Sequence, residues 1–168
     1  MISVIVALAA ASVAEQMAPA RQGMLQCQMP DVLFKTCLSL SKVRQVGPGN
    51  YRFETEILLD PNGPVVMSER NTAAVQGNNV CEVVRLWEID SWTVVIGGKA
   101  ANAAQTAKFR VAMKRRFAPL TGQTICTAIV SNEQEMHKVI ATIGGKRMPA
   151  FDYPMKWVAP DDGWKVGP

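Results

Sequence analysis

The chain has 168 residues, a formal net charge of +4 and an apolar content of 48%. This length and composition suit a single globular domain with one hydrophobic core, and they exclude an intrinsically disordered chain. The mild positive charge favours weak attraction to anionic surfaces, but it does not by itself indicate a nucleic-acid partner.

Residues 1–14 form an uncharged, almost wholly apolar run. The run has the length of a signal-peptide core and is too short for a bilayer-spanning helix, which needs about 20 apolar residues. Ser12 and Ala14 supply the small side chains of a cleavage site, although no Lys or Arg precedes the run. We predict a signal peptide cleaved after Ala14, periplasmic or secreted localisation, and no transmembrane segment after cleavage. Ala18-Pro19-Ala20 offers a second small-x-small pattern for cleavage, and a frayed helix of a cytosolic protein is the alternative.

Residues 15–26 are polar and Met-rich and are predicted to form an extended lead-in, followed by a single domain over residues 27–168. Period-two alternation predicts antiparallel strands over residues 36–46 and 51–59, and the turn Gly47-Pro48-Gly49-Asn50 joins them as a hairpin. In the second strand, Tyr51 through Leu59 at odd positions share one face. A strand over residues 65–70 and a weaker one over residues 73–76 follow.

Residues 82–92 indicate only a short helical turn near residues 89–91, and a strand is predicted over residues 93–96. The clearest helix is predicted over residues 100–118, where Phe109, Met113 and Phe117 recur at four-residue spacing. Further strands are predicted over residues 124–130, 136–143, 146–148 and 155–158. The expected fold is α+β, a curved antiparallel sheet of six to eight strands with one long helix packed on a face.

Four cysteines follow the apolar run: Cys27, Cys37, Cys81 and Cys126. None belongs to a C-x-x-C pair and the chain has one histidine, so no metal site is expected. An even number of cysteines after an export signal indicates two disulfides, for which three connectivities exist. We favour Cys27–Cys37 and Cys81–Cys126, and four buried free thiols are the alternative.

The densest charge cluster lies on the predicted helix and comprises Lys108, Arg110, Lys114, Arg115 and Arg116. These side chains flank both sides of a stripe of Ala and Val residues. An apolar strip with a cationic rim is a candidate surface for an anionic envelope component, such as a phospholipid or lipopolysaccharide headgroup. The alternative is an ordinary solvated helix. Nucleic acid is not expected as a partner.

No catalytic residues are expected. Glu135 and the single histidine, His137, would share a strand face, but nearby Ser131 lies in a predicted turn and in no nucleophile-elbow motif. The aromatic residues near the C-terminus are interpreted as closing the core, with a stacking platform for a sugar or peptide as the alternative. They are Phe151, Tyr153, Trp157 and Trp164.

Several short segments carry turns or cysteines. They are Cys27 and Cys37 with nine residues between them, and residues 59–65, 79–81, 118–126, 144–150 and 157–163. In these segments the chain resembles a group of small, secreted, uncharacterised proteins of alphaproteobacteria. The resemblance implies export and paired cysteines, and it implies neither an activity nor any site residues.

The sequence therefore predicts a secreted or periplasmic, non-enzymatic envelope protein without a cofactor. It would bind a partner or ligand through its sheet face or its basic helix, and the partner would be an anionic envelope component or another envelope protein. One alternative is a hydrolase with an unrecognised site. Another is a protease-inhibitor-like module that presents a rigid loop, such as residues 60–64 or 144–149.

Overall fold

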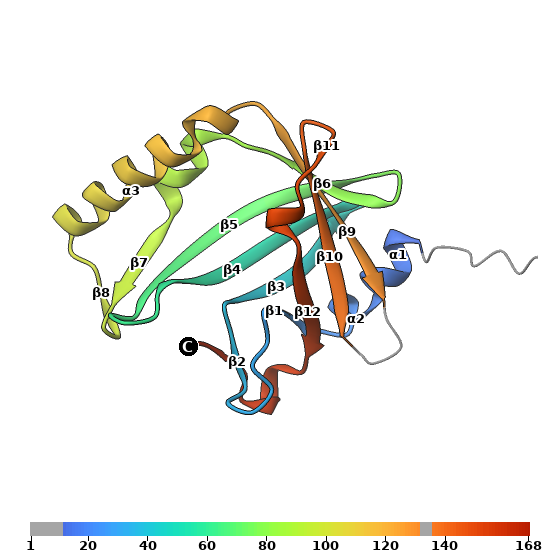
Figure 1. Cartoon of the computed structure of the whole chain (residues 1–168), viewed down its shortest axis with the longest axis horizontal. Coiled ribbons are helices and arrows are strands. Elements are labelled where there is room, and N and C mark those ends of the chain that lie inside the picture. The colour runs from blue at the N-terminus through green and yellow to red at the C-terminus, as the bar shows by residue number, and fades with distance from the viewer. Residues whose placement is uncertain (1–11, 132–135) are drawn as a thin grey trace, which may run out of the picture.

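The protein, described by a computed structural model over residues 12–131 and 136–168, is mostly β, with 49% strand and 25% helix. One eleven-stranded sheet includes eight strands in the order β4-β3-β1-β12-β10-β9-β6-β5, and β5 pairs again with β4. All of these pairings are antiparallel. The sheet therefore closes into an eight-stranded antiparallel barrel (Figure 1).

The barrel strands are β1 (Leu25–Gln28), β3 (Ser39–Gly47), β4 (Asn50–Asp60), β5 (Val65–Gln76), β6 (Asn79–Val83), β9 (Thr124–Ser131), β10 (His137–Ile143) and β12 (Tyr153–Val158). Short strands add to it or lie beside it: β2 (Thr36–Cys37), β7 (Thr93–Ile96), β8 (Lys99–Ala100), β11 (Lys146–Arg147) and β13 (Lys165–Val166). The helices are α1 (Val13–Gln16), α2 (Ala18–Arg21) and α3 (Ala103–Phe117). Four 3₁₀ segments complete the list: η1 (Leu86–Ser91), η2 (Ala118–Leu120), η3 (Pro149–Phe151) and η4 (Pro160–Asp162).

The predicted open, curved sheet is wrong. Alternation correctly identifies the β3–β4 hairpin, in which Ser41 lies opposite Thr55. However, alternation reports only which face of a strand is buried, and it carries no information on whether the first and last strands meet. The barrel closes because β5 is one long strand, rather than the two predicted over residues 65–70 and 73–76. Its length allows it to pair with β4 from Val65 to Ala74 and with β6 from Ala74 to Gln76.

The strand face predicted for β4 is correct up to Ile57 and wrong beyond it. Tyr51 and Thr55 are buried, as expected, but Leu58 is buried and Leu59 is exposed. The β4–β5 register is regular through the Leu58–Val66 pair, so Leu58 still belongs to the outer face, where its N–H donates to the carbonyl of Leu38. The register shifts only between Leu58 and Asp60, which displaces Leu59 from the inner face.

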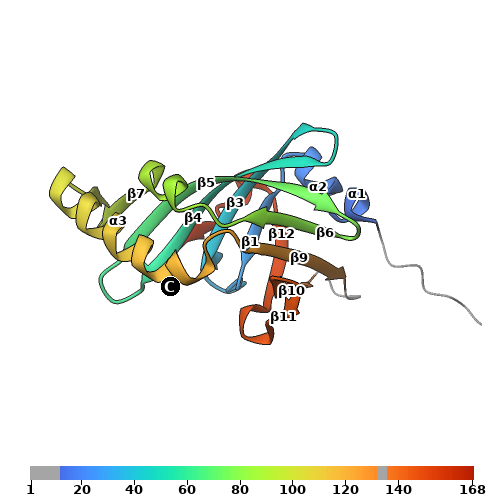
Figure 2. The same ribbon diagram turned by 90° about the horizontal axis from the view of Figure 1, so that it is seen from above.

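The long helix is present but does not cover a face of the barrel. α3 packs on η1 and β7 at one end of the molecule, beside the projecting end of β5 (Figures 1 and 2). Its Phe109, Met113 and Phe117 contact a small core cluster formed by Met67, Ile89 and Trp92. The helix therefore stabilises the segment that leads from β6 to β7, because that segment has little other apolar cover.

The segment predicted as an extended lead-in, residues 15–26, contains the end of α1, all of α2 and the start of β1. Ser12 caps α1 in a reciprocal arrangement with Glu15, and Pro19 lies in the first turn of α2. Met17 and Ala20 are buried and belong to the main core cluster together with side chains of seven barrel strands. Two short helices therefore pack against one end of the barrel, where the sequence indicates only a polar segment.

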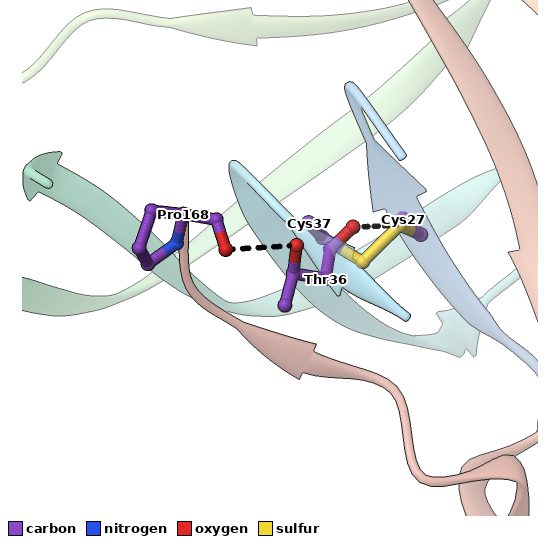
Figure 3. The surroundings of a disulfide bond; sticks show 4 residues. All are labelled: Cys27, Thr36, Cys37 and Pro168. Carbon is purple, nitrogen blue, oxygen red and sulfur yellow. Dashed lines mark hydrogen bonds between the residues drawn. A yellow bond between two sulfur atoms is a disulfide. The ribbon is translucent and has the colours of Figure 1, made fainter. Parts of the chain in front are cut away.

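Both predicted disulfides are confirmed. Cys27–Cys37 joins β1 to β2, and Cys81–Cys126 joins directly opposed positions of β6 and β9. The first disulfide lies beneath the C-terminal segment, where β13 pairs with β2 and the Thr36 hydroxyl donates to the carbonyl of Pro168 at 3.2 Å (Figure 3). The first link holds β2, with which the C-terminal strand β13 pairs, to β1, and the second link joins β6 to β9.

Candidate ligand-binding site

The inward-facing side chains of the barrel leave a cavity of about 140 Å³, which we call the interior cavity. Its apolar lining includes Phe53, Ala73, Val80, Ile125, Ile129 and Val139. Its polar lining includes Gln26, Gln28, Ser41, Thr55, Glu69, Asn71, Glu82, Thr127 and Tyr153. Eight-stranded barrels have room for packed side chains or for one small ligand, and an engineered apolar cavity of about 150 Å³ accommodates benzene.

A second space of about 180 Å³, the mouth cavity, lies beneath η1 at the α3 end of the barrel. Val84, Arg85, Glu88 and Trp92 contribute to its wall. The two cavities share five lining residues, which are Ile57, Glu69, Asn71, Glu82 and Ile125. The shared residues stand between the two cavities, so a polar group consisting of two carboxyls and one amide occupies the centre of the available space.

Strand periodicity explains why Glu69, Asn71 and Glu82 face inward. Alternate residues of a strand point to the same face, so Glu69 and Asn71 on β5 share the face of buried Met67 and Ala73. On β6, Glu82 follows buried Val80 by two residues. These three residues form the candidate site, and we call them the acid–amide group.

The barrel wall is interrupted beside the acid–amide group. In the described residues, β5 pairs with β6 only from Ala74 to Gln76 and with β7 only from Val65 to Ser68. Residues 69–73 therefore lack a strand partner on that edge. Glu69 and Asn71 also line an outer groove of about 810 Å³, to which Trp87 and Glu88 contribute. The acid–amide group is thus reached from solvent through this side of the barrel.

The site weakens the acidity of its carboxyl groups. Burial, with smaller contributions from Glu82 and Glu88, raises the pKa of Glu69 to about 7. Burial also raises the pKa of Glu82, and the hydrogen bond that Asn71 Nδ2 donates to it opposes this change. The pKa of Tyr153 is raised by burial and by the negative charge of Glu82. A poorly solvated pair of carboxyls disfavours its own double ionisation.

Several acceptors at the site have no partner within the described residues. The carboxyl group of Glu69 makes no hydrogen bond or ion pair there, and Asn71 Oδ1 is buried without a donor. Arg85 is the only basic residue among those that line the two cavities, and its Nη1 lies 3.2 Å from Glu88 Oε1. The described residues that line the two cavities therefore offer more hydrogen-bond acceptors and more negative charge than donors and positive charge.

The five basic residues of α3 are not part of this site. Arg110 Nε and Nη2 donate to the carbonyl of Trp92 at 3.2 and 2.9 Å, and Lys114 Nζ lies 2.6 Å from Asp90 Oδ1. Both residues thus hold the helix to η1 and the start of β7. Lys108, Arg115 and Arg116 are exposed on the outer side of α3. The cationic surface predicted from the sequence consequently reduces to these three side chains, and their binding role stays a prediction.

The catalytic candidates do not assemble around the cavity. His137 is half-buried on β10, where burial lowers its pKa, and it is not among the residues lining either cavity. Ser131 ends β9 directly opposite His137, rather than lying in the predicted turn. Glu135 lies outside the described residues. Among the C-terminal aromatic residues, Trp157 is in the main core and Tyr153 packs against it, as interpreted, and Tyr153 also lines the interior cavity.

Sequence reasoning missed the acid–amide group, although a signal was present. The alternate positions of residues 65–75 read Val, Met, Glu, Asn, Ala and Val, so two polar residues interrupt an otherwise apolar face. A solvated strand face explains a polar run, but it does not explain polar residues at core positions. Such an interruption is the sequence signature of a polar group inside a core.

Comparisons of the chain with protein-family models, curated proteins and solved structures found no match. In the described part of the chain, no helix has the length and apolar character needed to cross a bilayer. Within residues 12–131 and 136–168, no group of three or more His, Cys, Asp or Glu side chains is arranged to hold a metal ion.

Proposed function

We propose that the protein binds a small ligand inside its barrel, in the periplasm or in the extracellular space. The single observation that carries this proposal is the acid–amide group, where the Glu69 carboxyl and Asn71 Oδ1 face the cavities without a hydrogen-bond partner among the described residues. A buried polar group without a partner destabilises a protein, so a core selected only for stability would carry apolar side chains here. Destabilising polar groups inside a cavity are characteristic of binding sites.

The proposal assigns binding to the inner face of the sheet instead of the basic helix. The interior cavity offers about 140 Å³ lined on several sides, whereas α3 has no buried residue and offers a convex surface. A small molecule gains affinity from being surrounded, because most of its surface leaves water. The sheet face is therefore the better candidate of the two surfaces expected from the sequence.

Export is supported by the two disulfides, because disulfides persist in oxidising compartments. Material purified from the native host without reductant is expected to begin at Glu15 and to contain both links. This cleavage falls within α1 and removes its cap Ser12 and the buried Val13. Peptide mapping by mass spectrometry reads both features at once. Recovery from the cytosol of chains that still begin at Met1, with all four thiols open to alkylation, would contradict the export part of the proposal.

Ligand binding is tested by filling the interior cavity. Ala73 is buried and lines the cavity, so Ala73→Leu places additional methyl groups in the space that a ligand would occupy. We expect it to weaken binding of benzene-sized probes at least tenfold, which corresponds to about 1.4 kcal/mol, while the protein stays folded. The measurement is a protein-observed NMR titration with benzylamine, benzyl alcohol and benzoate.

The matched control is Ala107→Leu, which adds the same groups to an exposed position of α3 and should leave probe binding unchanged. The proposal is wrong if none of the three probes perturbs the resonances of interior residues in the parent protein. It is also wrong if Ala73→Leu and Ala107→Leu bind the probes equally well.

A further inference from the structure

We infer that the ligand is a small organic amine, whose ammonium group is held between Glu69 and Glu82 while its apolar body fills the interior cavity. The inference rests on the proposed function and names the chemical class of its ligand. Two independent observations support it, namely the imbalance of charge around the acid–amide group and the acceptors there that lack donors.

The charge around the cavities favours a cation. Glu69, Glu82 and Glu88 line them, and Arg85 is the only basic side chain among the described lining residues. Arg85 is ion-paired with Glu88, and it lowers the pKa of Glu82 only as the smallest of the influences on that carboxyl. Glu69 has no cationic partner within the described residues. Two carboxylates in a poorly solvated space repel each other, and a cation placed between them removes that cost. An anionic ligand would increase the repulsion.

The hydrogen-bond inventory points to a donor-rich group. Glu69 offers both carboxylate oxygens, and the buried Asn71 Oδ1 offers another acceptor. Glu82 receives one hydrogen bond from Asn71 and has further acceptor capacity. An ammonium group has three donors and no acceptor, so it satisfies these oxygens and leaves none of its own groups unpaired.

Tyr153 gives a separate indication that a ligand belongs here. It is a deeply placed phenol that lines the interior cavity, and its pKa is raised by burial and by Glu82. Its hydroxyl has no hydrogen-bond partner within the described residues. The Tyr153 and Phe53 rings both line the cavity, and aromatic faces attract ammonium groups and pack against apolar rings.

A metal ion fits the site less well than an organic cation. No group of three or more His, Cys, Asp or Glu side chains in the described residues is arranged to hold one. Calcium takes six to eight oxygen ligands, whereas the acid–amide group supplies two carboxyls and one amide. The apolar half of the lining, which includes Ile129 and Val139, also has no role in a metal site.

The groove through which a ligand would enter carries both charges. On the outer strand faces, Lys42, Arg52 and Arg70 lie along it with Glu54 and Glu56. Arg70 is paired with Glu54 at 3.3 Å. The groove therefore does not favour cations over neutral or anionic ligands, and the preference for a cation arises at the acid–amide group itself.

The test compares benzylamine with benzyl alcohol, which has a similar shape but no charge. Calorimetric titrations are made about one pH unit above the pKa of Glu69, where that carboxyl is mainly ionised. In the parent protein we expect benzylamine to bind at least tenfold more tightly than benzyl alcohol. Glu69→Gln and Glu82→Gln should each bring this ratio close to one, because each removes a charge with which the ammonium group pairs and the neutral alcohol does not.

The control is Glu56→Gln, which removes a carboxyl from the exposed outer face of β4 and should keep the parent ratio. Equal binding of the two probes inside the parent barrel would overturn the amine inference and leave the proposed function standing. Retention of the amine preference in both Glu69→Gln and Glu82→Gln would also overturn it. Binding of neither probe in the interior would refute the proposed function itself.

Discussion

Removing the Cys81–Cys126 disulfide is expected to lower the free energy of unfolding by about 4 kcal/mol. The link closes a loop of 45 residues, and in the chain-entropy model a loop of that length restricts the unfolded chain by about this amount. A loss of this size is a large part of the 5–15 kcal/mol that stabilises a typical domain. Urea unfolding of Cys81→Ala/Cys126→Ala without reductant measures it.

The position of this disulfide adds a structural consequence. β6 pairs with β5 through only three residue pairs, from Ala74 to Gln76, so the barrel is weakly joined there. Loss of the link to β9 should raise hydrogen-exchange rates in β6 more than in β3 or β4. The matched control is Cys27→Ala/Cys37→Ala, whose ten-residue separation predicts a smaller loss, of about 3 kcal/mol. A smaller effect at Cys81–Cys126 than at Cys27–Cys37 would contradict this account.

Replacing Glu69 with Gln is expected to stabilise the protein above neutral pH, by about 3 kcal/mol. The pKa of Glu69 rises from 4.5 to about 7 on folding, so between these values the folded state binds more protons than the unfolded state. The contribution of Glu69 to stability is therefore fully present below the unfolded pKa and is lost as the pH rises through 7. Gln keeps the neutral character of the protonated acid at every pH.

Urea unfolding of the parent and of Glu69→Gln across this pH range measures the difference between them. Taking the difference between the two proteins cancels the pH dependence that other groups give to stability. One such group is Asp152, whose pKa is lowered to about 2 chiefly by its hydrogen bond with Arg147. Its contribution to stability is lost as the pH falls, which is opposite to that of Glu69. Glu56→Gln is the control, since its carboxyl is exposed and should change little. The expectation fails if Glu69→Gln and the parent differ by the same amount at low and high pH.

Much of the local structure could be predicted from the sequence because it depends on neighbouring residues. The β3–β4 hairpin follows from strict alternation on both sides of a Gly-Pro-Gly-Asn turn, and α3 follows from helix-forming residues that end at Pro119. Both disulfide partners were identified because few pairings connect four cysteines. The hairpin and the helix depend on residues that are close in the sequence, and the disulfides depend on a choice among only three pairings.

Closure of the barrel could not be predicted in the same way. It depends on β5, which is a single strand from Val65 to Gln76. The polar residues from Ser68 to Thr72 interrupt its apolar pattern, so the sequence predicts two separate strands there. The same residues conceal the binding site, because Glu69 and Asn71 look like surface residues until their face is known to be internal. The polar residues in the middle of β5 are unusual for a core strand, and they lie where the barrel closes and where the acid–amide group is found.

The role of α3 was also beyond sequence reasoning. Its Phe109–Met113–Phe117 stripe correctly predicts a buried side, but a stripe does not say which partner covers it. The partner is η1 with the end of β5, in a segment whose residues 82–92 gave no clear pattern. Two of the basic residues have a structural role, because Arg110 and Lys114 hold the helix to that segment.

The most direct test is to locate a bound probe by intermolecular nuclear Overhauser effects. We expect contacts from the ring protons of bound benzylamine to the methyl groups of Ala73, Ile129 and Val139, all of which line the interior cavity. Contacts confined to exposed methyl groups, such as those of Ile96 and Val111, would show that the probe binds outside the barrel and would contradict the account.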